Sequence, residues 1–217
     1  MNVIEQSIDC SSYDGPGAFQ VVAFEIDPKA DADLVHEAMK AAREQGGTSL
    51  DPSGGVRASS TLIKTRYLGA LSELVLAQYL QDRLGQSCQV HREPFHDYSS
   101  HVDLKVSKNE STVELEVRGS FPYSPLERVI CKLFDIIGPY SASYKLGEEA
   151  KDIYLRTLIN ESVQNFSVER RHTLWFVGGA ERDLFERIGH DSDLKQRGAR
   201  YRLIKPISLA RDVPAVL

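Results

Sequence analysis

The stretch that decides the fold of this chain is His101-Val-Asp-Leu-Lys-Val-Ser-Lys-Asn-Glu-Ser-Thr-Val-Glu-Leu-Glu-Val-Arg-Gly119. Apolar residues alternate with polar ones along residues 102–106 and again along residues 113–117. This alternation predicts two β-strands, because successive side chains of a strand point to opposite faces of a sheet. The six polar residues between the runs, 107–112, favour a short turn, so we predict an antiparallel hairpin.

The register of this hairpin follows if Val106 lies opposite Val113. Asp103 then lies opposite Glu116, on a face of the hairpin that is polar throughout. One explanation is a solvated face, which is common on antiparallel hairpins. The other is a metal site, because carboxylates from neighbouring strands converge and Mg²⁺ takes oxygen ligands.

Upstream of the hairpin, the clearest pattern is helical. Apolar residues at helical spacing run through residues 61–84, and Gly85 supplies the C-terminal stop. Residues 19–26 are rich in Val and Phe and predict a strand, whereas the spacing in residues 32–45 predicts a further helix. The small and polar residues 48–60 predict a loop.

Length and composition predict one ordinary domain. The 217 residues suffice for a single core, and 41% of them are hydrophobic and 26% charged. No apolar run approaches the roughly 18 residues that a membrane helix requires. The N-terminal residues also lack the basic and apolar segments of a secretory signal, so we expect a soluble protein.

The three cysteines favour a reducing compartment. Cys10, Cys88 and Cys131 are odd in number and widely separated, so they predict neither a disulfide framework nor a CxxC metal pair. We therefore expect a cytoplasmic protein.

The charge is polarised along the chain. The net charge of -5 argues against a nucleic-acid binder, and residues 1–60 hold ten acidic and four basic residues. Residues 194–210, however, contain five basic residues and no acidic one. These are Lys195, Arg197, Arg200, Arg202 and Lys205. This segment either meets a phosphate backbone or is a solvated surface.

Three segments in this order resemble the PD-(D/E)xK nuclease superfamily. They are Gly69-Ala-Leu-Ser-Glu73 in the predicted helix, His101-Val-Asp103-Leu in the first strand and Leu115-Glu116-Val-Arg118-Gly-Ser in the second. The likeness extends over residues 66–204. A predicted helix at 127–137, strands at 152–159 and 173–177, and a strand-to-helix turn at 178–185 continue it.

The resemblance implies an α/β fold with a restriction-endonuclease-like core, in which a central mixed β-sheet is flanked by helices. Residues 1–217 then form a single domain, with a nuclease-like core at 61–205 and an N-terminal extension, 1–60, packed on or beside it. The implied activity is Mg²⁺-dependent cleavage of double-stranded DNA, with Mn²⁺ as a substitute, by a restriction or defence endonuclease. The family also implies a homodimer.

Carried over residue by residue, the resemblance makes Asp103 and Glu116 metal ligands, together with the carbonyl of Val117. Glu73 would support the metal or its waters. Arg118 occupies the place of the family's lysine, and this is a departure. An arginine is always protonated, so it can stabilise charge or position a water but cannot act as a base.

Further alternatives concern the acidic ligand and the function. Glu114 offers a Glu-x-Glu variant of the ligand set, although the register turns it toward Lys105. A nuclease-fold protein that binds DNA without cutting it is the alternative that Arg118 favours. An interaction protein without a nucleic-acid role is the alternative that the net acidity favours.

Several basic residues are candidates for contact with DNA. Arg66, Gly69 and Glu73 share a helical face, which directs Glu73 to the site and lets Arg66 touch a phosphate, unless Arg66 is a surface cation. Arg197, Arg200 and Arg202 are the corresponding candidates in the basic segment.

Overall fold

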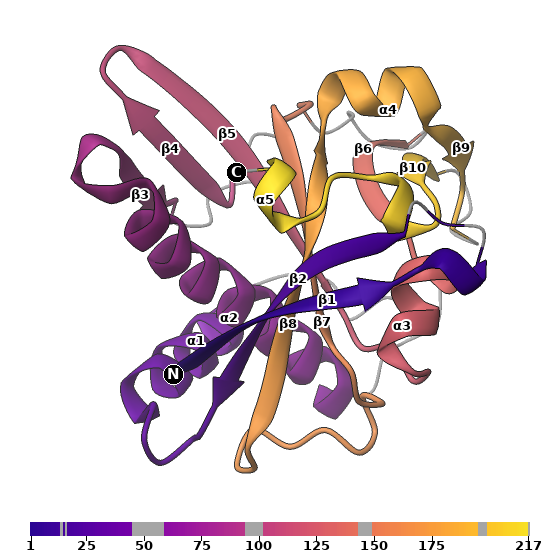
Figure 1. Ribbon diagram of the computed structural model, residues 1–217. Coiled ribbons are helices and arrows are strands. Elements are labelled where there is room, and N and C mark those ends of the chain that lie inside the picture. The colour runs from indigo at the N-terminus through magenta and orange to yellow at the C-terminus, as the bar shows by residue number, and fades with distance from the viewer. Residues whose placement is uncertain are drawn as a thin grey trace.

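A seven-stranded mixed sheet forms the centre of the computed structural model, which describes residues 1–13, 15, 17–44, 59–93, 102–142, 149–194 and 199–216 (Figure 1). In spatial order the strands are β1 (Asn2–Asp9), β2 (Ala18–Ile26), β8 (His172–Glu181), β7 (Ile153–Ile159), β5 (Ser111–Ser120), β4 (Leu104–Lys108) and β3 (Gln89–Arg92). All neighbours are antiparallel except β5 and β7, which are parallel.

Helices and a smaller sheet flank this sheet. The helices α1 (Ala32–Glu44) and α2 (Ser59–Leu84) pack against each other, and α2 also packs on β5 and β3. The smaller sheet has the order β6 (Ile136–Ala142), β10 (Ala199–Ile204) and β9 (His190–Ser192). The shorter helices are α3 (Leu126–Arg128), the π-helix η3 (Val129–Leu133), α4 (Arg182–Ile188), α5 (Val213–Val216) and the 3₁₀ turns η1 (Ser11–Tyr13), η2 (Gly85–Ser87) and η4 (Ile207–Leu209). The predicted α/β fold with a central mixed sheet flanked by helices is confirmed.

The sheet separates two apolar cores. On one face, α2 packs on the apolar side chains of β4 and β5, among them Leu104, Leu115 and Val117. On the other face, Tyr154 and Leu158 of β7 pack with residues of η3 and α4. Because side chains alternate along a strand, the polar residues between these apolar positions of β5 lie on the face away from α2.

The close approach of α2 to β5 depends on a glycine. A Cβ atom added at Gly119 would lie 2.7 Å from Cγ of Leu68 in α2. Real Cβ atoms do not come this close to a neighbour, so a larger residue here would force the Leu68 side chain to shift. Gly119 therefore makes room for Leu68 of α2 against the strand that carries the polar face.

The predicted hairpin register is confirmed. Val106 pairs with Val113, and Lys105 pairs with Glu114. Lys108 and Ser111 close the hairpin, so Asn109 occupies the first position of a two-residue turn, with a φ of 54°. Asparagine tolerates this left-handed conformation, which matches the twist of a tight hairpin.

The N-terminal region contributes two strands to the same sheet and a helix that packs on α2. The predicted strand at 19–26 and helix at 32–45 are confirmed as β2 and α1, and β1 extends the sheet beyond β2. The helix predicted at 61–84 is confirmed as α2, which begins two residues earlier. The loop predicted at 48–60 lies outside the described residues except for the start of α2. Among the described residues, no helix is long and apolar enough to cross a membrane.

Two predictions downstream of the hairpin need correction. The helix predicted at 127–137 is α-helical only at Leu126–Arg128, becomes a π-helix and then gives way to β6 at Ile136. The strands predicted at 152–159 and 173–177 are confirmed, but β8 continues through Gly178 to Glu181 before α4 begins. Gly178 has a φ of +87°, and a Cβ there would overlap the Arg211 carbonyl, so this glycine serves a close backbone contact within the strand.

The prediction that the cysteines form no disulfide is wrong. Cys10 and Cys131 form a disulfide between residues 121 apart in sequence, with their Cα atoms 5.3 Å apart. Both lie in the core on the face away from α2, whereas Cys88 is free and buried. The pairing depends on the fold bringing the end of β1 against η3, which sequence spacing does not reveal.

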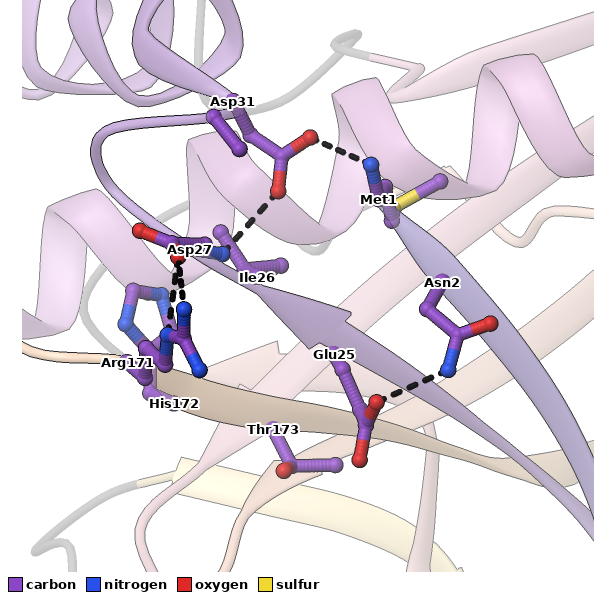
Figure 2. A pocket seen from close by; sticks show the side chains of 10 residues that line it. Met1, Asn2, Glu25, Ile26, Asp27, Asp31, Arg171, His172 and Thr173 are labelled. Atoms are coloured by element: carbon purple, nitrogen blue, oxygen red, sulfur yellow. Dashed lines mark hydrogen bonds and ion pairs between the residues drawn. The ribbon is translucent and has the colours of Figure 1, made fainter.

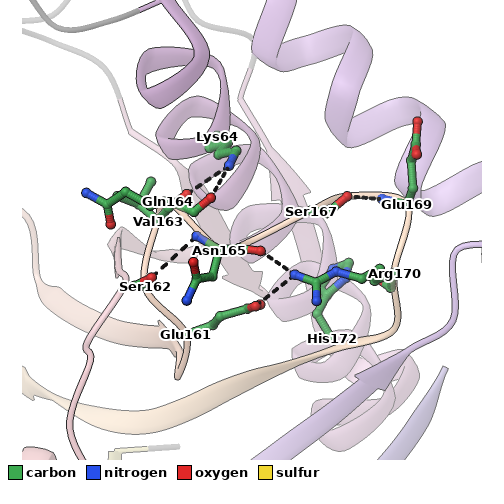
Figure 3. Close-up of polar contacts among 10 residues, drawn as sticks. All are labelled: Lys64, Glu161, Ser162, Val163, Gln164, Asn165, Ser167, Glu169, Arg170 and His172. Carbon is green, nitrogen blue, oxygen red and sulfur yellow. Dashed lines mark hydrogen bonds and ion pairs between the residues drawn. The ribbon is translucent and has the colours of Figure 1, made fainter.

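A buried histidine ends the connection from β7 to β8. Figure 3 shows Lys64 of α2 reaching the carbonyls of Val163 and Gln164, at 2.9 and 3.1 Å. His172 Nδ1 lies 2.9 Å from the carbonyl of Arg170, and its Nε2 lies 3.3 Å from the Tyr67 hydroxyl. A carbonyl only accepts, so Nδ1 carries the proton and Nε2 accepts from Tyr67. Burial lowers the pKa of His172 below its ordinary value of 6.5.

We predict that acidification destabilises the protein through His172. Below pH 6.5, His172 binds a proton more readily in the unfolded chain than in the folded chain. The contribution of neutral His172 to the free energy of unfolding is therefore complete above pH 6.5. It decreases as the pH falls below that value, by at most about 1.4 kcal/mol per pH unit. Urea unfolding at pH 7.5 and 5.5 measures the effect. His172→Asn should show a smaller loss than the parent, whereas the exposed control His36→Gln should behave like the parent. Equal losses in all three proteins would contradict the prediction.

Candidate functional site

Asp103 lies immediately before β4 and is buried, with 6% of the residue exposed. Its Oδ2 atom accepts a hydrogen bond of 2.6 Å from the backbone N–H of Val117. At regular pairing, Asp103 would face Glu116, as the sequence predicts. The hydrogen bond therefore brings the Asp103 carboxylate against the backbone of the β5 residue next to Glu116.

The carbonyl of Val117 points to the same side of β5 as its N–H. Both backbone groups of Glu114 bond to Asp152 on the β7 side, the N–H at 2.8 Å and the carbonyl at 3.0 Å. Backbone direction alternates along a strand, so both backbone groups of Val117 face the β4 side, where Asp103 lies. The Asp103 carboxylate and the Val117 carbonyl oxygen therefore both lie where β4 begins.

Glu116 and Arg118 lie on the same face of β5, away from α2. The Arg118 guanidinium is 3.3 Å from a carboxylate oxygen of Glu116, and their side chains are 21% and 14% exposed. This contact agrees with the alternation of a strand, which puts residues two apart on one face. Glu114 instead lies 4.0 Å from Lys105, which is the cross-strand contact that the register predicts.

Glu73 lies on the opposite side of the sheet from Glu116. It projects from α2, and its Oε2 accepts a hydrogen bond of 2.7 Å from Nε of Arg92 on β3. The Glu73 side chain is 8% exposed and that of Arg92 is 27% exposed. The expected support of a metal by Glu73 would therefore have to come from the face opposite Glu116.

Asp103, Glu116 and the Val117 carbonyl would offer a metal ion oxygen ligands only, the type that Mg²⁺ prefers. Among the residues that the structure describes, no group of three or more His, Cys, Asp and Glu side chains is arranged to hold a metal ion. Structural and catalytic zinc sites need three or four such ligands. Mg²⁺ is usually bound by one or two carboxylates and completed by waters and substrate phosphates. Asp103, Glu116 and the Val117 carbonyl are a set of the second kind.

Arg156 of β7 is a charged neighbour of this site that the sequence patterns did not single out. In the parallel pairing of β5 and β7 it lies opposite Arg118. Burial lowers its pKa to about 10, Asp135 opposes this shift and the charge of Arg118 adds to it. Arg156 is therefore protonated at neutral pH. Only the β5–β7 register reveals this neighbour, and no local pattern encodes that register.

The predicted DNA-binding arginines have different surroundings. Arg66 is half-buried on α2. Arg200 and Arg202 both bind Asp191, whose pKa they hold below its usual range through side-chain hydrogen bonds. Arg202 Nε also donates to the Phe185 carbonyl at 3.0 Å. Lys195, Arg197 and His101 lie outside the described residues.

A hollow elsewhere in the molecule has its own internal pairing. Figure 2 shows it at the junction of β2 and β8, with the side chains of Asp27 and Arg171 directed at each other, 2.8 Å apart. Asp31 accepts from the Asp27 N–H at 2.9 Å, and Asn2 donates to Glu25 at 2.8 Å. These polar groups are hydrogen-bond partners of one another. The hollow lies at the other end of the sheet from Asp103.

The comparisons with known proteins give one relative and no function. No protein-family model matches the chain, and no solved structure matches it. Among curated proteins, it is similar to an uncharacterized protein of Methanocaldococcus jannaschii, MJECS01, with 29% identity over 236 residues. The match covers 92% of this chain and 84% of that protein.

We predict that the Glu73–Arg92 pair stabilises the fold. Glu73→Gln should lower the free energy of unfolding by about 1–3 kcal/mol, because it weakens a charged hydrogen bond that is largely shielded from water. Glu5→Gln is a matched control, since Glu5 also pairs with an arginine, Arg83, but both side chains are about half exposed or more. That variant should change stability by less than about 1 kcal/mol. Urea unfolding measures both variants, and equal changes in their free energy of unfolding would contradict the prediction.

Proposed function

We propose that this chain is a Mg²⁺-dependent endonuclease that hydrolyses phosphodiester bonds in double-stranded DNA. The observation that carries the proposal is the hydrogen bond from the Val117 amide to Asp103, which brings this carboxylate to β5 beside Glu116. The order of these residues along the chain, with Arg118 after them, resembles the PD-(D/E)xK pattern. The mixed sheet flanked by helices is compatible with a restriction-endonuclease-like core.

In this proposal, Asp103, Glu116 and the Val117 carbonyl hold the ion. The ion would neutralise charge on the phosphate and make a bound water more acidic, and Mn²⁺ is expected to substitute for it. Arg118 places a fixed positive charge next to this set and stabilises negative charge that develops on the phosphate. Glu116 orients Arg118, because the two groups are 3.3 Å apart. Since a guanidinium does not give up its proton, Arg118 does not act as a base.

The remaining parts of the proposal follow from the family resemblance. We propose a role in restriction or defence and a homodimeric assembly. The cytoplasmic location expected from the cysteines loses its basis, because Cys10 and Cys131 form a disulfide. Arg66 is the described basic residue on α2 that we assign to a phosphate contact. Arg200 and Arg202 bind DNA only if Asp191 shares them with a phosphate, since both already pair with it.

We predict that Asp103→Asn and Glu116→Gln each abolish detectable Mg²⁺-dependent cleavage of duplex DNA while affinity for DNA in Ca²⁺ stays within about threefold. Both changes remove a negative metal ligand and keep the size of the side chain. Asn at 103 also keeps an oxygen that can accept the Val117 N–H, so the backbone contact survives. Cleavage is followed on a mixed panel of labelled duplexes.

The control for this experiment is Asp103→Ala, which removes the acceptor as well as the charge. It should lose stability in thermal unfolding as well as cleavage, whereas Asp103→Asn should unfold near the parent temperature. Cleavage that persists in folded Asp103→Asn and Glu116→Gln would overturn the metal-site assignment.

A second candidate is a nuclease-fold DNA-binding protein that does not cut. The observation in its favour is that two acidic candidates already have cationic partners, Glu116 with Arg118 and Glu73 with Arg92. An arginine beside a carboxylate supplies the positive charge that a metal would otherwise bring, and it weakens the attraction of that carboxylate for a cation.

We predict that Arg118 separates the two candidates. In an active enzyme, Arg118→Lys should retain substantial cleavage, and Arg118→Ala should lose on the order of a hundredfold or more, as when one charge-stabilising donor is removed. Unchanged cleavage by Arg118→Ala would show that Arg118 has no catalytic role. A parent that cleaves nothing in Mg²⁺ or Mn²⁺, with activity gained in Arg118→Lys, would establish the second candidate.

A further inference from the structure

Arg156 and Arg118 project from neighbouring strands to the same face of the sheet. They are directly opposite in the parallel β5–β7 register, and opposite residues of paired strands share a face. The residues on either side of Arg156 on that face, Tyr154 and Leu158, are buried in the core away from α2. Arg156 is therefore a cation within an apolar layer, with 2% of the residue exposed.

The contacts of Arg156 fix it to the strand that carries the candidate site. One terminal nitrogen donates to Ser120 Oγ at 3.0 Å, and the other donates to the Arg118 carbonyl at 3.4 Å. Asp135, just before β6, supplies a negative charge at 3.9 Å. The Nε atom is buried and has no hydrogen-bond partner in the described part of the chain.

These contacts compensate poorly for burying a charge. A buried cation needs close ion pairing and full hydrogen bonding, and here the carboxylate stands at the limit of ion-pair distance. Apolar residues of similar volume often replace buried ion pairs without loss of stability. Stability therefore does not account for a guanidinium at this position.

The charge of Arg156 has a direct effect on Arg118. Two like charges on adjacent strands, whose axes are about 4.8 Å apart, repel each other in a poorly solvated layer. The repulsion disfavours an approach of the Arg118 guanidinium to Arg156, and the observed partner of Arg118 is Glu116, at 3.3 Å.

We infer that Arg156 is a positioning residue, which anchors β5 at Arg118 and Ser120 and directs the Arg118 guanidinium toward Glu116 and the substrate phosphate. It acts through Arg118 and does not touch the substrate. This inference rests on the proposed function, because the orientation of Arg118 affects cleavage only if Arg118 acts on a substrate phosphate.

The experiment compares Arg156→Met, which removes the charge and keeps an unbranched apolar side chain, with Arg156→Lys, which keeps the charge. On a labelled duplex in Mg²⁺, Arg156→Met should lower kcat by about ten- to a hundredfold, as expected for a misplaced catalytic group, with KM within about twofold. Arg156→Lys should recover most of kcat. The control is Arg187→Met, an exposed arginine of α4 paired with Asp183, which should match the parent.

A second measurement does not require cleavage. In ¹⁵N-resolved NMR spectra of the arginine side chains, the Nε–H signal of Arg118 should shift in Arg156→Met, return toward the parent in Arg156→Lys and stay unchanged in Arg187→Met. If the parent cleaves nothing, the proposed function fails, and this signal still tests the positioning. An unchanged Arg118 signal in Arg156→Met, or equal loss of kcat in the Met and Lys variants, overturns the inference.

A variant that keeps all charges covers the case in which Arg156→Met does not fold. Ser120→Ala removes one hydrogen bond of Arg156 and should shift the Arg118 signal in the same direction by a smaller amount. With an active parent, it should also lower kcat by about three- to tenfold, which corresponds to the typical value of one hydrogen bond. If the Arg118 signal of Ser120→Ala is identical to that of the parent, this experiment overturns the inference.

Discussion

The hydrogen bond from the Val117 amide to the Asp103 carboxylate closes the hairpin of β4 and β5 at its open end. At this point β4 has not yet begun, so the side chain of Asp103 takes the place of a partner strand for the Val117 N–H. A buried amide without an acceptor costs about 1–3 kcal/mol, so this contact stabilises the hairpin whatever else Asp103 does. It also fixes a carboxylate beside Glu116, and the candidate site depends on that placement.

The two faces of the sheet carry different charged groups. On the α2 side, the Glu73–Arg92 pair is the charged contact near the hairpin, and it sits at the border of an otherwise apolar core. On the other side, Arg118 pairs with Glu116 and Arg156 faces Asp135, so two positive and two negative charges lie within a partly buried layer.

The disulfide and the π-helix show how distant segments shape this second face. Cys131 lies in η3, and four residues later Asp135 faces Arg156. The bond to Cys10 ties η3 to the end of β1, so the segment that supplies the counter-ion of Arg156 is anchored to the first strand of the chain. This anchoring does not follow from helical periodicity, which predicted a continuous helix through residues 127–137.

The sequence by itself determined the elements whose information is local. Alternating residues specified β4, β5 and their register, because a shift by one residue would turn Leu104, Leu115 and Val117 out of the core. Helical spacing specified α2 in the same way. Only the tertiary structure decided that Arg156 lies beside Arg118, that Glu73 pairs with Arg92 and that Cys10 meets Cys131. These partners come from segments far apart in the chain, and their contacts depend on strand order and helix packing, which local periodicity does not encode.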